Sequence, residues 1–186
     1  MNFICIDFIN SAWYSSHREY GEALANPEWI ASFTEKWMME AIDMPDAEEL
    51  AELIRLRELL ADALASVKAD GKLSPQVIGT LNHYLFSGIY SRRIVNTEDG
   101  YMLEKVPVNQ GWTWVESEIA ESFIDLISNH EIERIRYCEN PQCGWIFYDK
   151  TKNRSGRWCD DSCRNLMKVR RFRERKRKDK LADTEI

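Results

Sequence analysis

The sequence has no long apolar run and no leader-like start. Nowhere do about 18 consecutive apolar residues occur, so a transmembrane helix is not expected. The first ten residues lack the basic region of a secretory signal and carry Asp7 within their apolar stretch, which predicts a cytoplasmic protein. Glycine and proline are few, 8 and 5 in 186 residues, and 44 % of residues are apolar. This composition predicts a folded globular chain rather than a low-complexity one.

Familiar catalytic motifs are missing as well. The three histidines, His17, His83 and His130, are isolated, and no His-Glu-x-x-His pair, Gly-x-Ser-x-Gly turn or glycine-rich phosphate loop occurs. An enzyme is therefore not expected, and no catalytic residue is predicted. The N-terminal tryptophans and tyrosines suit core packing, although a small-molecule pocket among them stays open.

The two ends of the chain differ in charge. Residues 1–133 contain 9 Lys or Arg against 23 Asp or Glu, whereas residues 134–186 contain 16 against 8. The net charge of −6 for the whole chain hides this contrast. An acidic part followed by a basic part is typical of a chain that meets a polyanion at one end. We therefore predict an acidic body, residues 1–133, and a basic C-terminal domain, residues 134–186.

Local signals in the body predict an α+β fold, mainly helical with short strands. Helix starts are indicated at three places: Asn26-Pro27, Asp46 with Glu49, and Ser74-Pro75. Ser117 is a further candidate cap, for the last helix of the body. The apolar residues 3–10 predict a strand, and residues 90–106 predict a β-hairpin because turn-forming residues divide them.

Four of the five cysteines are grouped near the C-terminus. Cys138, Cys143, Cys159 and Cys163 follow the spacing C-x4-C-x15-C-x3-C, while Cys5 stands alone in an apolar stretch. In a cytosolic chain this pattern predicts one structural zinc ion, since disulfides would not persist there. Four thiolates complete a tetrahedron and leave no open position for catalysis. The fifteen-residue spacer is interpreted as a β-hairpin and the following residues as a helix, the order of a treble-clef-like finger.

The segment after the last cysteine predicts a strongly basic helix. Ten of the seventeen residues from Arg164 to Lys180 are basic and two are acidic. Such a helix needs a counter-charge, for which nucleic-acid phosphate is the first candidate and an acidic protein surface the second. Leu166, Val169 and Phe172 form a short apolar stripe that we expect to pack on the zinc hairpin. The candidate nucleic-acid contacts are Arg154, Arg157, Arg164, Asn165, Lys168, Arg170, Arg171, Arg173, Arg175 and Lys178.

The motifs around the cysteines resemble the CGNR zinc-finger family. The resemblance is carried by Cys143-Gly-Trp-x-Phe-x-Asp149, Asn153-Arg-Ser-x-Arg-Trp-Cys159 and Cys163-x-Asn165. Two segments of the body, Ile4–Asn10 and Ile54–Leu59, are similar to the ABATE domain that precedes the finger in that family. The sequence departs from the name motif, because Cys163-Arg164-Asn165-Leu166 replaces Cys-Gly-Asn-Arg. All four cysteines that the family uses as zinc ligands are kept.

The resemblance implies a candidate bacterial stress-induced transcription regulator, with DNA bound by the finger and a sensory or regulatory body. The leading hypothesis is therefore a cytoplasmic DNA-binding regulator that holds one zinc ion and does not enter a membrane. A small-molecule or protein effector of the body and a homodimer are further partners that stay open. The alternative is a zinc-dependent interaction module that binds an acidic protein partner without nucleic acid. Shielding of the basic tail by the acidic body is a third, charge-based hypothesis.

Overall fold

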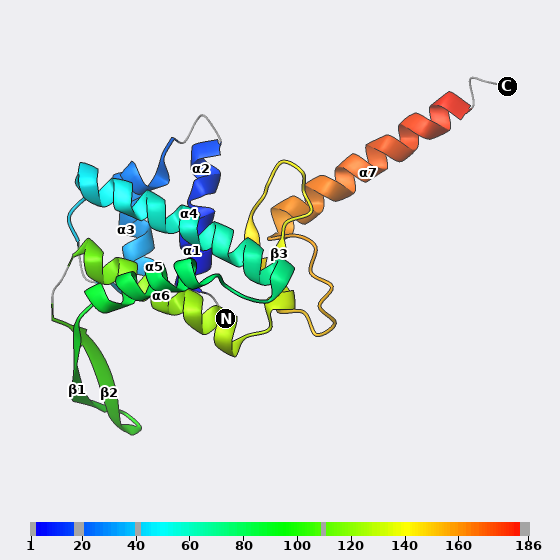
Figure 1. The fold of residues 1–186 in the computed structure, drawn as a ribbon. Coiled ribbons are helices and arrows are strands. Elements are labelled where there is room, and N and C mark those ends of the chain that lie inside the picture. The colour runs from blue at the N-terminus through cyan, green and yellow to red at the C-terminus, as the bar shows by residue number, and fades with distance from the viewer. Residues whose placement is uncertain (1–2, 17–20, 40–41, 109–110, 183–186) are drawn as a thin grey trace. The chain divides into compact units, whose positions relative to one another are not determined.

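Figure 1 shows the computed structural model, which describes residues 3–16, 21–39, 42–108 and 111–182. The chain divides into two compact units, Asn2–Ile132 and Glu133–Ile186. We refer to them as the body and the finger. Within the described ranges, no helix combines the length and the apolar character needed to cross a bilayer.

The body is helical apart from one hairpin. Its helices are α1 (Ile4–Asn10), α2 (Ala12–Ser16), the 3-10 turn η1 (Ala23–Ala25), α3 (Pro27–Lys36), α4 (Ala47–Asp70), α5 (Pro75–Ser87) and α6 (Trp112–Asn129). The antiparallel hairpin consists of β1 (Tyr90–Thr97) and β2 (Gly100–Pro107). After the 3-10 turn η2 (Ile132–Arg134), the finger contains β3 (Ile135–Tyr137), β4 (Ile146–Tyr148) and α7 (Asp161–Ala182). Helices, two small hairpins and a terminal basic helix confirm the predicted α+β class.

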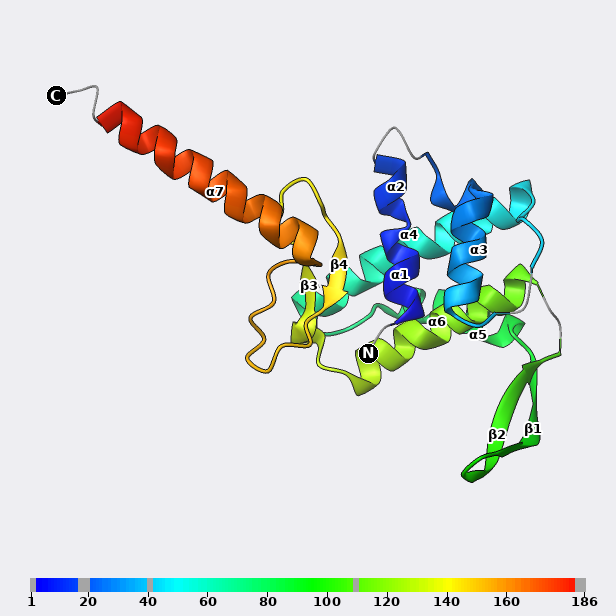
Figure 2. The same cartoon turned by 180° about the vertical axis from the view of Figure 1, so that it is seen from behind.

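Helix α6 forms the centre of the body's core. It packs against α1, α4 and α5, an arrangement that Figures 1 and 2 show from opposite sides. Its apolar stripe is fully buried and consists of Val115, Ile119, Ala120, Phe123 and Leu126. Helix α4 supplies a second stripe, Leu53, Leu56, Leu60 and Leu64. The spacing of three and four residues places each stripe on one helix face, and each large side chain contributes about 1.5–3 kcal/mol on burial.

Short-range capping signals place three of the helix starts where the sequence predicts them. The Asn26 side chain accepts a hydrogen bond from the amide of Glu28 at 2.9 Å and caps α3. At α4 the Asp46 carboxylate accepts the Glu49 amide at 2.9 Å, and the Glu49 carboxylate accepts the Asp46 amide at 2.9 Å. Ser74 caps α5 in the same way. These bonds satisfy amide groups that a helix leaves unpaired in its first turn.

The predicted strand at residues 3–10 is wrong, because these residues form α1. Phe3, Ile4, Cys5, Ile6, Phe8 and Ile9 are all buried, so the segment is apolar around nearly its whole circumference. A short run of this kind has no periodicity that separates a buried helix from a buried strand. The one charged residue of this segment, Asp7, forms an ion pair with Lys36 at 2.5 Å and accepts a hydrogen bond from the Trp37 indole at 3.0 Å.

The predicted cap at Ser117 is also wrong. Helix α6 begins at Trp112, more than a turn earlier, and Gly111 is its N-cap residue. The Ser117 hydroxyl instead donates a hydrogen bond to the carbonyl of Leu85 at 3.4 Å, at the contact between α5 and α6. The chain passes very close to α6 here, since a Cβ atom added at Gly88 would lie 2.1 Å from the Cβ of Ser117. Only glycine fits this crossing.

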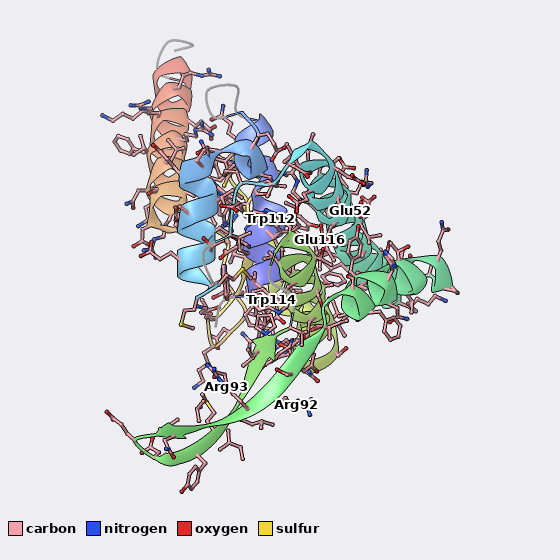
Figure 3. The ribbon with its side chains drawn as sticks, turned by 90° about the vertical axis from the view of Figure 1, so that its left-hand side faces the viewer. Glu52, Arg92, Arg93, Trp112, Trp114 and Glu116 are labelled. Atoms are coloured by element: carbon pink, nitrogen blue, oxygen red, sulfur yellow. The ribbon has the colours of Figure 1, made fainter. Side chains whose placement is uncertain are left out.

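A buried carboxyl group, Glu116, lies on α6 beside Glu52 of α4 (Figure 3). Only 7 % of Glu116 is exposed, and in the described part of the chain its carboxyl has neither a hydrogen bond nor an ion pair. Burial, with smaller contributions from the negative charges of Glu52 and Glu49, raises the pKa of Glu116 from 4.5 to about 7. The folded body therefore favours the protonated form of this group.

We predict that the body loses stability between pH 5 and pH 8 because of Glu116. The folded-state pKa lies above the unfolded value, so the stabilisation is complete below about pH 4.5 and is lost as the pH rises through about 7. A Glu116→Gln variant should remove this dependence and gain on the order of 2–3 kcal/mol at pH 8. Urea unfolding at both pH values measures it. Glu58→Gln, on the exposed side of α4, is the control, and an equal response of both variants would contradict the prediction.

Candidate metal centre and basic helix

The finger is built on a very short hairpin whose loop carries the first cysteine pair. Strand β3 pairs antiparallel with β4, and their inward residues Ile135 and Ile146 are buried. The amide of Cys138 donates a hydrogen bond to the carbonyl of Trp145 at 2.8 Å, which closes the loop that carries the first two cysteines. The prediction of a hairpin within the spacer is wrong, because the partner of β4 is β3. The return segment is joined by a bond from the amide of Glu139 to the carbonyl of Arg157, 2.9 Å long.

The four cysteines of the finger come together in space. Their sulfur atoms all lie within 4.8 Å of one another, and the Sγ atoms of Cys143 and Cys159 are 3.7 Å apart. A tetrahedral zinc site with Zn–S bonds of about 2.3 Å has sulfur–sulfur edges of about 3.8 Å. The cluster therefore fits one zinc ion. Cys138 is buried and the other three are half-buried, as in a closed structural site.

Burial opposes charge on two of these thiols in the absence of a cation. It raises the pKa of Cys143 to about 11 and also raises the pKa of Cys159. A bound divalent cation supplies the opposing charge, so the thiolates form as zinc displaces their protons.

Asn140 links the cysteine loop to α7. It is 5 % exposed, and its side-chain amide donates a hydrogen bond to the Sγ of Cys163 at 3.4 Å. Its side-chain oxygen accepts bonds from the Gln142 amide and from Arg170 of α7, both 3.3 Å long. Arg170 also donates to the side chain of Gln142. One guanidinium group thus ties the helix to the loop, and an amide that donates a hydrogen bond to a ligating sulfur, as Asn140 does, orients that thiolate.

A buried carboxylate organises the loop after β4. Asp149 is 1 % exposed and accepts hydrogen bonds from the amides of Thr151 at 2.9 Å and Gly156 at 2.8 Å. Burial acts to raise the pKa of Asp149, but these hydrogen bonds and nearby Arg136 hold it below its usual value. A Cβ atom at Gly156 would lie 2.6 Å from the carboxylate. The motif residue Asp149 therefore has a structural role that spacing alone does not reveal.

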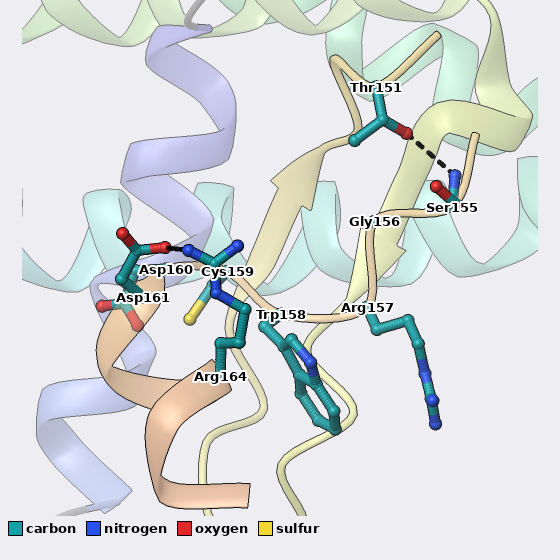
Figure 4. A pocket seen from close by; sticks show the side chains of 9 residues that line it. All are labelled: Thr151, Ser155, Gly156, Arg157, Trp158, Cys159, Asp160, Asp161 and Arg164. Atoms are coloured by element: carbon teal, nitrogen blue, oxygen red, sulfur yellow. Dashed lines mark hydrogen bonds and ion pairs between the residues drawn. The ribbon is translucent and has the colours of Figure 1, made fainter. Parts of the chain in front are cut away.

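Helix α7 begins beside the cysteine cluster. The carboxylate of Asp160 accepts a hydrogen bond from the amide of Cys163 at 2.8 Å and caps the helix. A hollow of about 450 Å³ lies next to this start and is lined by Thr151, Ser155, Gly156, Arg157, Trp158, Cys159, Asp160, Asp161 and Arg164 (Figure 4). In Figure 4, Arg164 reaches back to Asp161, with which it forms an ion pair. Basic and acidic groups are thus mixed in the hollow.

The ten predicted nucleic-acid contacts differ in their surroundings. Several are held within the finger: Arg157 by Glu139, Arg164 by Asp161, Arg170 by Asn140 and Gln142, and Arg171 over the Trp158 ring at 5.6 Å. Lys168, Arg173 and Arg175 are exposed, and the described residues include no acidic partner for them. Asn165 is exposed too, Arg154 lies in the loop with a φ of 53°, and the side chain of Lys178 lies outside the described residues.

The apolar stripe of α7 differs from its prediction. Leu166, Val169 and Phe172 are exposed by 43 %, 45 % and 52 %, so they do not pack fully on the zinc hairpin. The hairpin has three residues in each strand and is too small to cover a helix that continues for several turns.

Comparison with known families agrees with the division of the chain. The ABATE family model, described as "Putative stress-induced transcription regulator", matches residues 3–130. The chain belongs to this family. Residues 134–176 match the CGNR zinc finger, which confirms the resemblance seen in the sequence. Together with the cysteine cluster, this match supports one structural zinc ion in the CGNR finger. Neither family is an enzyme family, and no curated protein that was compared matches the chain.

Loss of one cysteine should abolish zinc binding. We expect the wild-type ABATE protein to hold about one zinc ion per chain and Cys159→Ser to hold less than about a tenth, since zinc contributes on the order of 10–16 kcal/mol to folding such modules. Metal analysis of the purified proteins measures this. Cys5→Ala is the control, because Cys5 lies in α1 of the body and outside the cluster. Full zinc content in Cys159→Ser would rule out Cys159 as a ligand.

Gly156→Ala should loosen the CGNR finger without removing a ligand. The added Cβ would displace the Asp149 carboxylate and break the hydrogen bonds that it accepts from the amides of Thr151 and Gly156. We expect this to lower the stability of the finger by about 1–3 kcal/mol. Faster zinc release to a chelator and faster amide exchange at Thr151 and Gly156 would report it. The control is Ser155→Ala, which keeps the hydrogen bond from the backbone amide of residue 155 to the Thr151 hydroxyl. Zinc release from this variant should stay at the wild-type rate.

Proposed function

We propose that this ABATE protein is a DNA-binding transcription regulator in which the CGNR finger and α7 contact DNA. The proposal is carried by three exposed cations on α7 for which the described residues include no acidic partner: Lys168, Arg173 and Arg175. Residues 134–186 have a balance of 16 basic to 8 acidic residues, which favours a polyanionic partner. The family descriptions support a regulator of transcription.

In this proposal zinc has a structural role and the chain's own residues meet the nucleic acid. Bound to the four thiolates, the ion fixes the loop and the start of α7. Lys168 and Arg175 belong to the same helix row as Arg164 and Arg171, since the positions are three or four residues apart. Arg157 and Arg171 lie over the Trp158 ring at 5.2 and 5.6 Å, which restrains both guanidinium groups at the finger surface. Such a row can follow a line of phosphates.

The body is proposed to receive the regulatory signal. In this scheme a small molecule or another protein acts on the ABATE body under stress and alters the activity of the finger in the bacterial cytoplasm. A homodimer would let two fingers act together, because many DNA-binding proteins read two half-sites with a two-fold symmetric pair.

A second function remains a candidate because of one observation. The exposed stripe Leu166, Val169 and Phe172 lies on the same helix as the basic residues. Apolar side chains next to cations suit a groove on an acidic protein better than a phosphate backbone. The alternative is therefore a zinc-dependent module that binds an acidic protein and no nucleic acid.

DNA binding by the full-length, zinc-loaded protein should depend steeply on salt. If about six phosphates are neutralised, log K falls against log salt with a slope near −5. A variant with Lys168→Ala and Arg175→Ala should reduce the magnitude of this slope by about 2, because two phosphate contacts are removed. Fluorescence anisotropy with a labelled random duplex across a salt series measures both slopes.

The matched control replaces Lys68 and Lys72 of the body by alanine. It changes the net charge by the same amount but leaves α7 intact, so its slope should equal that of the wild type. Equal slopes for the two variants would mean that α7 does not contact the duplex. No binding by the wild type at low salt would favour the protein-interaction function.

A further inference from the structure

Exposed apolar side chains are concentrated on one part of the body. Of the fifteen large apolar residues found exposed in the described chain, nine lie between residues 78 and 108: Ile78, Phe86, Ile89, Tyr90, Ile94, Tyr101, Met102, Leu103 and Val108. A large side chain presents roughly 150–250 Å² when fully exposed, so these nine present on the order of 1,000 Å². A standard protein interface buries about 800 Å² on each partner. This segment therefore holds most of the large apolar side chains that the described part of the body exposes.

Most of these residues belong to the hairpin β1–β2, which extends away from the helices of the body (Figure 3). A two-stranded ribbon in water is marginally stable by itself. The second half of β2 is partly covered, because Lys105 binds Glu118 at 2.5 Å and also Glu121 on α6. In β1, by contrast, every residue except Val95 is exposed. Of the two outer edges of the hairpin, that of β1 is therefore the more exposed.

The backbone of β1 offers a regular row of free groups. The amide of Val108 donates to the carbonyl of Ile89 at 2.9 Å, so this pair is a hydrogen-bonded pair of the antiparallel ladder. Such pairs alternate along the strands, and the register Tyr90↔Pro107 to Thr97↔Gly100 continues without a bulge. It follows that the N–H and C=O groups of Tyr90, Arg92, Ile94 and Asn96 point away from β2. They form an edge that another strand can join.

The charges along β1 are complementary to those of a second copy of β1 that runs antiparallel to it. At its base, Arg92 contacts the Tyr90 ring at 5.7 Å, and within the described residues it has no acidic partner. At the turn, Glu98 and Asp99 are exposed, and the described residues include no basic partner for them. The hairpin therefore carries an unpaired positive charge at one end of the strand and unpaired negative charges at the other.

We propose that β1 is the surface through which two copies of this chain pair, antiparallel across a two-fold axis at Val95. In this register Arg92 lies opposite Glu98 of the partner subunit, and Ile94 lies opposite Asn96 of the partner subunit. The outward backbone groups of Ile94 then face those of the partner's Asn96, and the side chain of each Arg92 faces the partner's Glu98 at the turn. The pair forms a four-stranded sheet, on which Ile94, Leu103 and Tyr101 of the two copies join in one apolar face. The inference does not depend on DNA binding.

Charge reversal tests this register in full-length, zinc-loaded protein without DNA. The wild type should sediment as a dimer in a concentration series. By symmetry a single reversal changes two pairs, so R92E and E98R should each raise the dimer dissociation constant by about tenfold or more. The double variant R92E/E98R exchanges the two charges and should return to within about threefold of the wild type.

Proline provides a second test that does not depend on charge. The amide of Ile94 points away from β2, so Ile94→Pro removes a bond to the partner strand and none within the hairpin, whereas Ile94→Ser keeps the amide. Dimerisation should be lost in the former and retained, though weakened, in the latter. A wild type that stays monomeric, or single reversals that leave the dissociation constant unchanged, would overturn the proposal. DNA binding is measured in a separate experiment, so a negative result for dimerisation does not bear on the proposed function of the finger.

Discussion

The finger depends on the attraction between four thiolates and one zinc ion, because it has almost no apolar core. In its described part only two apolar side chains besides Cys138 are buried, Ile135 and Ile146. Two such residues cannot offset the conformational entropy lost when a chain of this length is ordered. The metal therefore replaces the core, as it does in other small modules. The body, with its buried stripes on α4 and α6, has no such need.

A few hydrogen-bonding side chains connect the zinc site to α7 and hold the start of the helix in place. Asp160 caps the helix, Asn140 contacts the Sγ of Cys163, and Arg170 holds the cysteine loop from the helix side. Net charge consequently overstates the number of cations available to a partner. Arg157, Arg164 and Arg170 are engaged within the finger, whereas Lys168, Arg173 and Arg175 are exposed and have no acidic partner among the described residues.

Sequence predicted those features that are set by neighbouring residues. The caps at Asn26, Asp46 and Ser74, the turn of the β1–β2 hairpin and the cysteine spacing all act within a few positions, and the structure has them where they were expected. The errors concern choices made by distant partners. Residues 3–10 became a helix because the body surrounds them, and β4 paired with β3 rather than with the returning spacer. The hydrogen bond from Arg170 to Asn140 could not be predicted either, since it forms only when the fold brings residues 140 and 170 together.

Gly88 shows that a residue without a side chain can be as restricted as one in the core. It lies against Ser117, and two residues later the chain enters β1. Any larger residue would push the end of α5 off α6 and redirect the root of the hairpin. Variation at this position should therefore be rare among functional members of the family, although Gly88 belongs neither to the cysteine cluster nor to a strand. Purifying selection at such a site reflects the spacing of two helices, and a search for binding residues based on invariance alone would misread it.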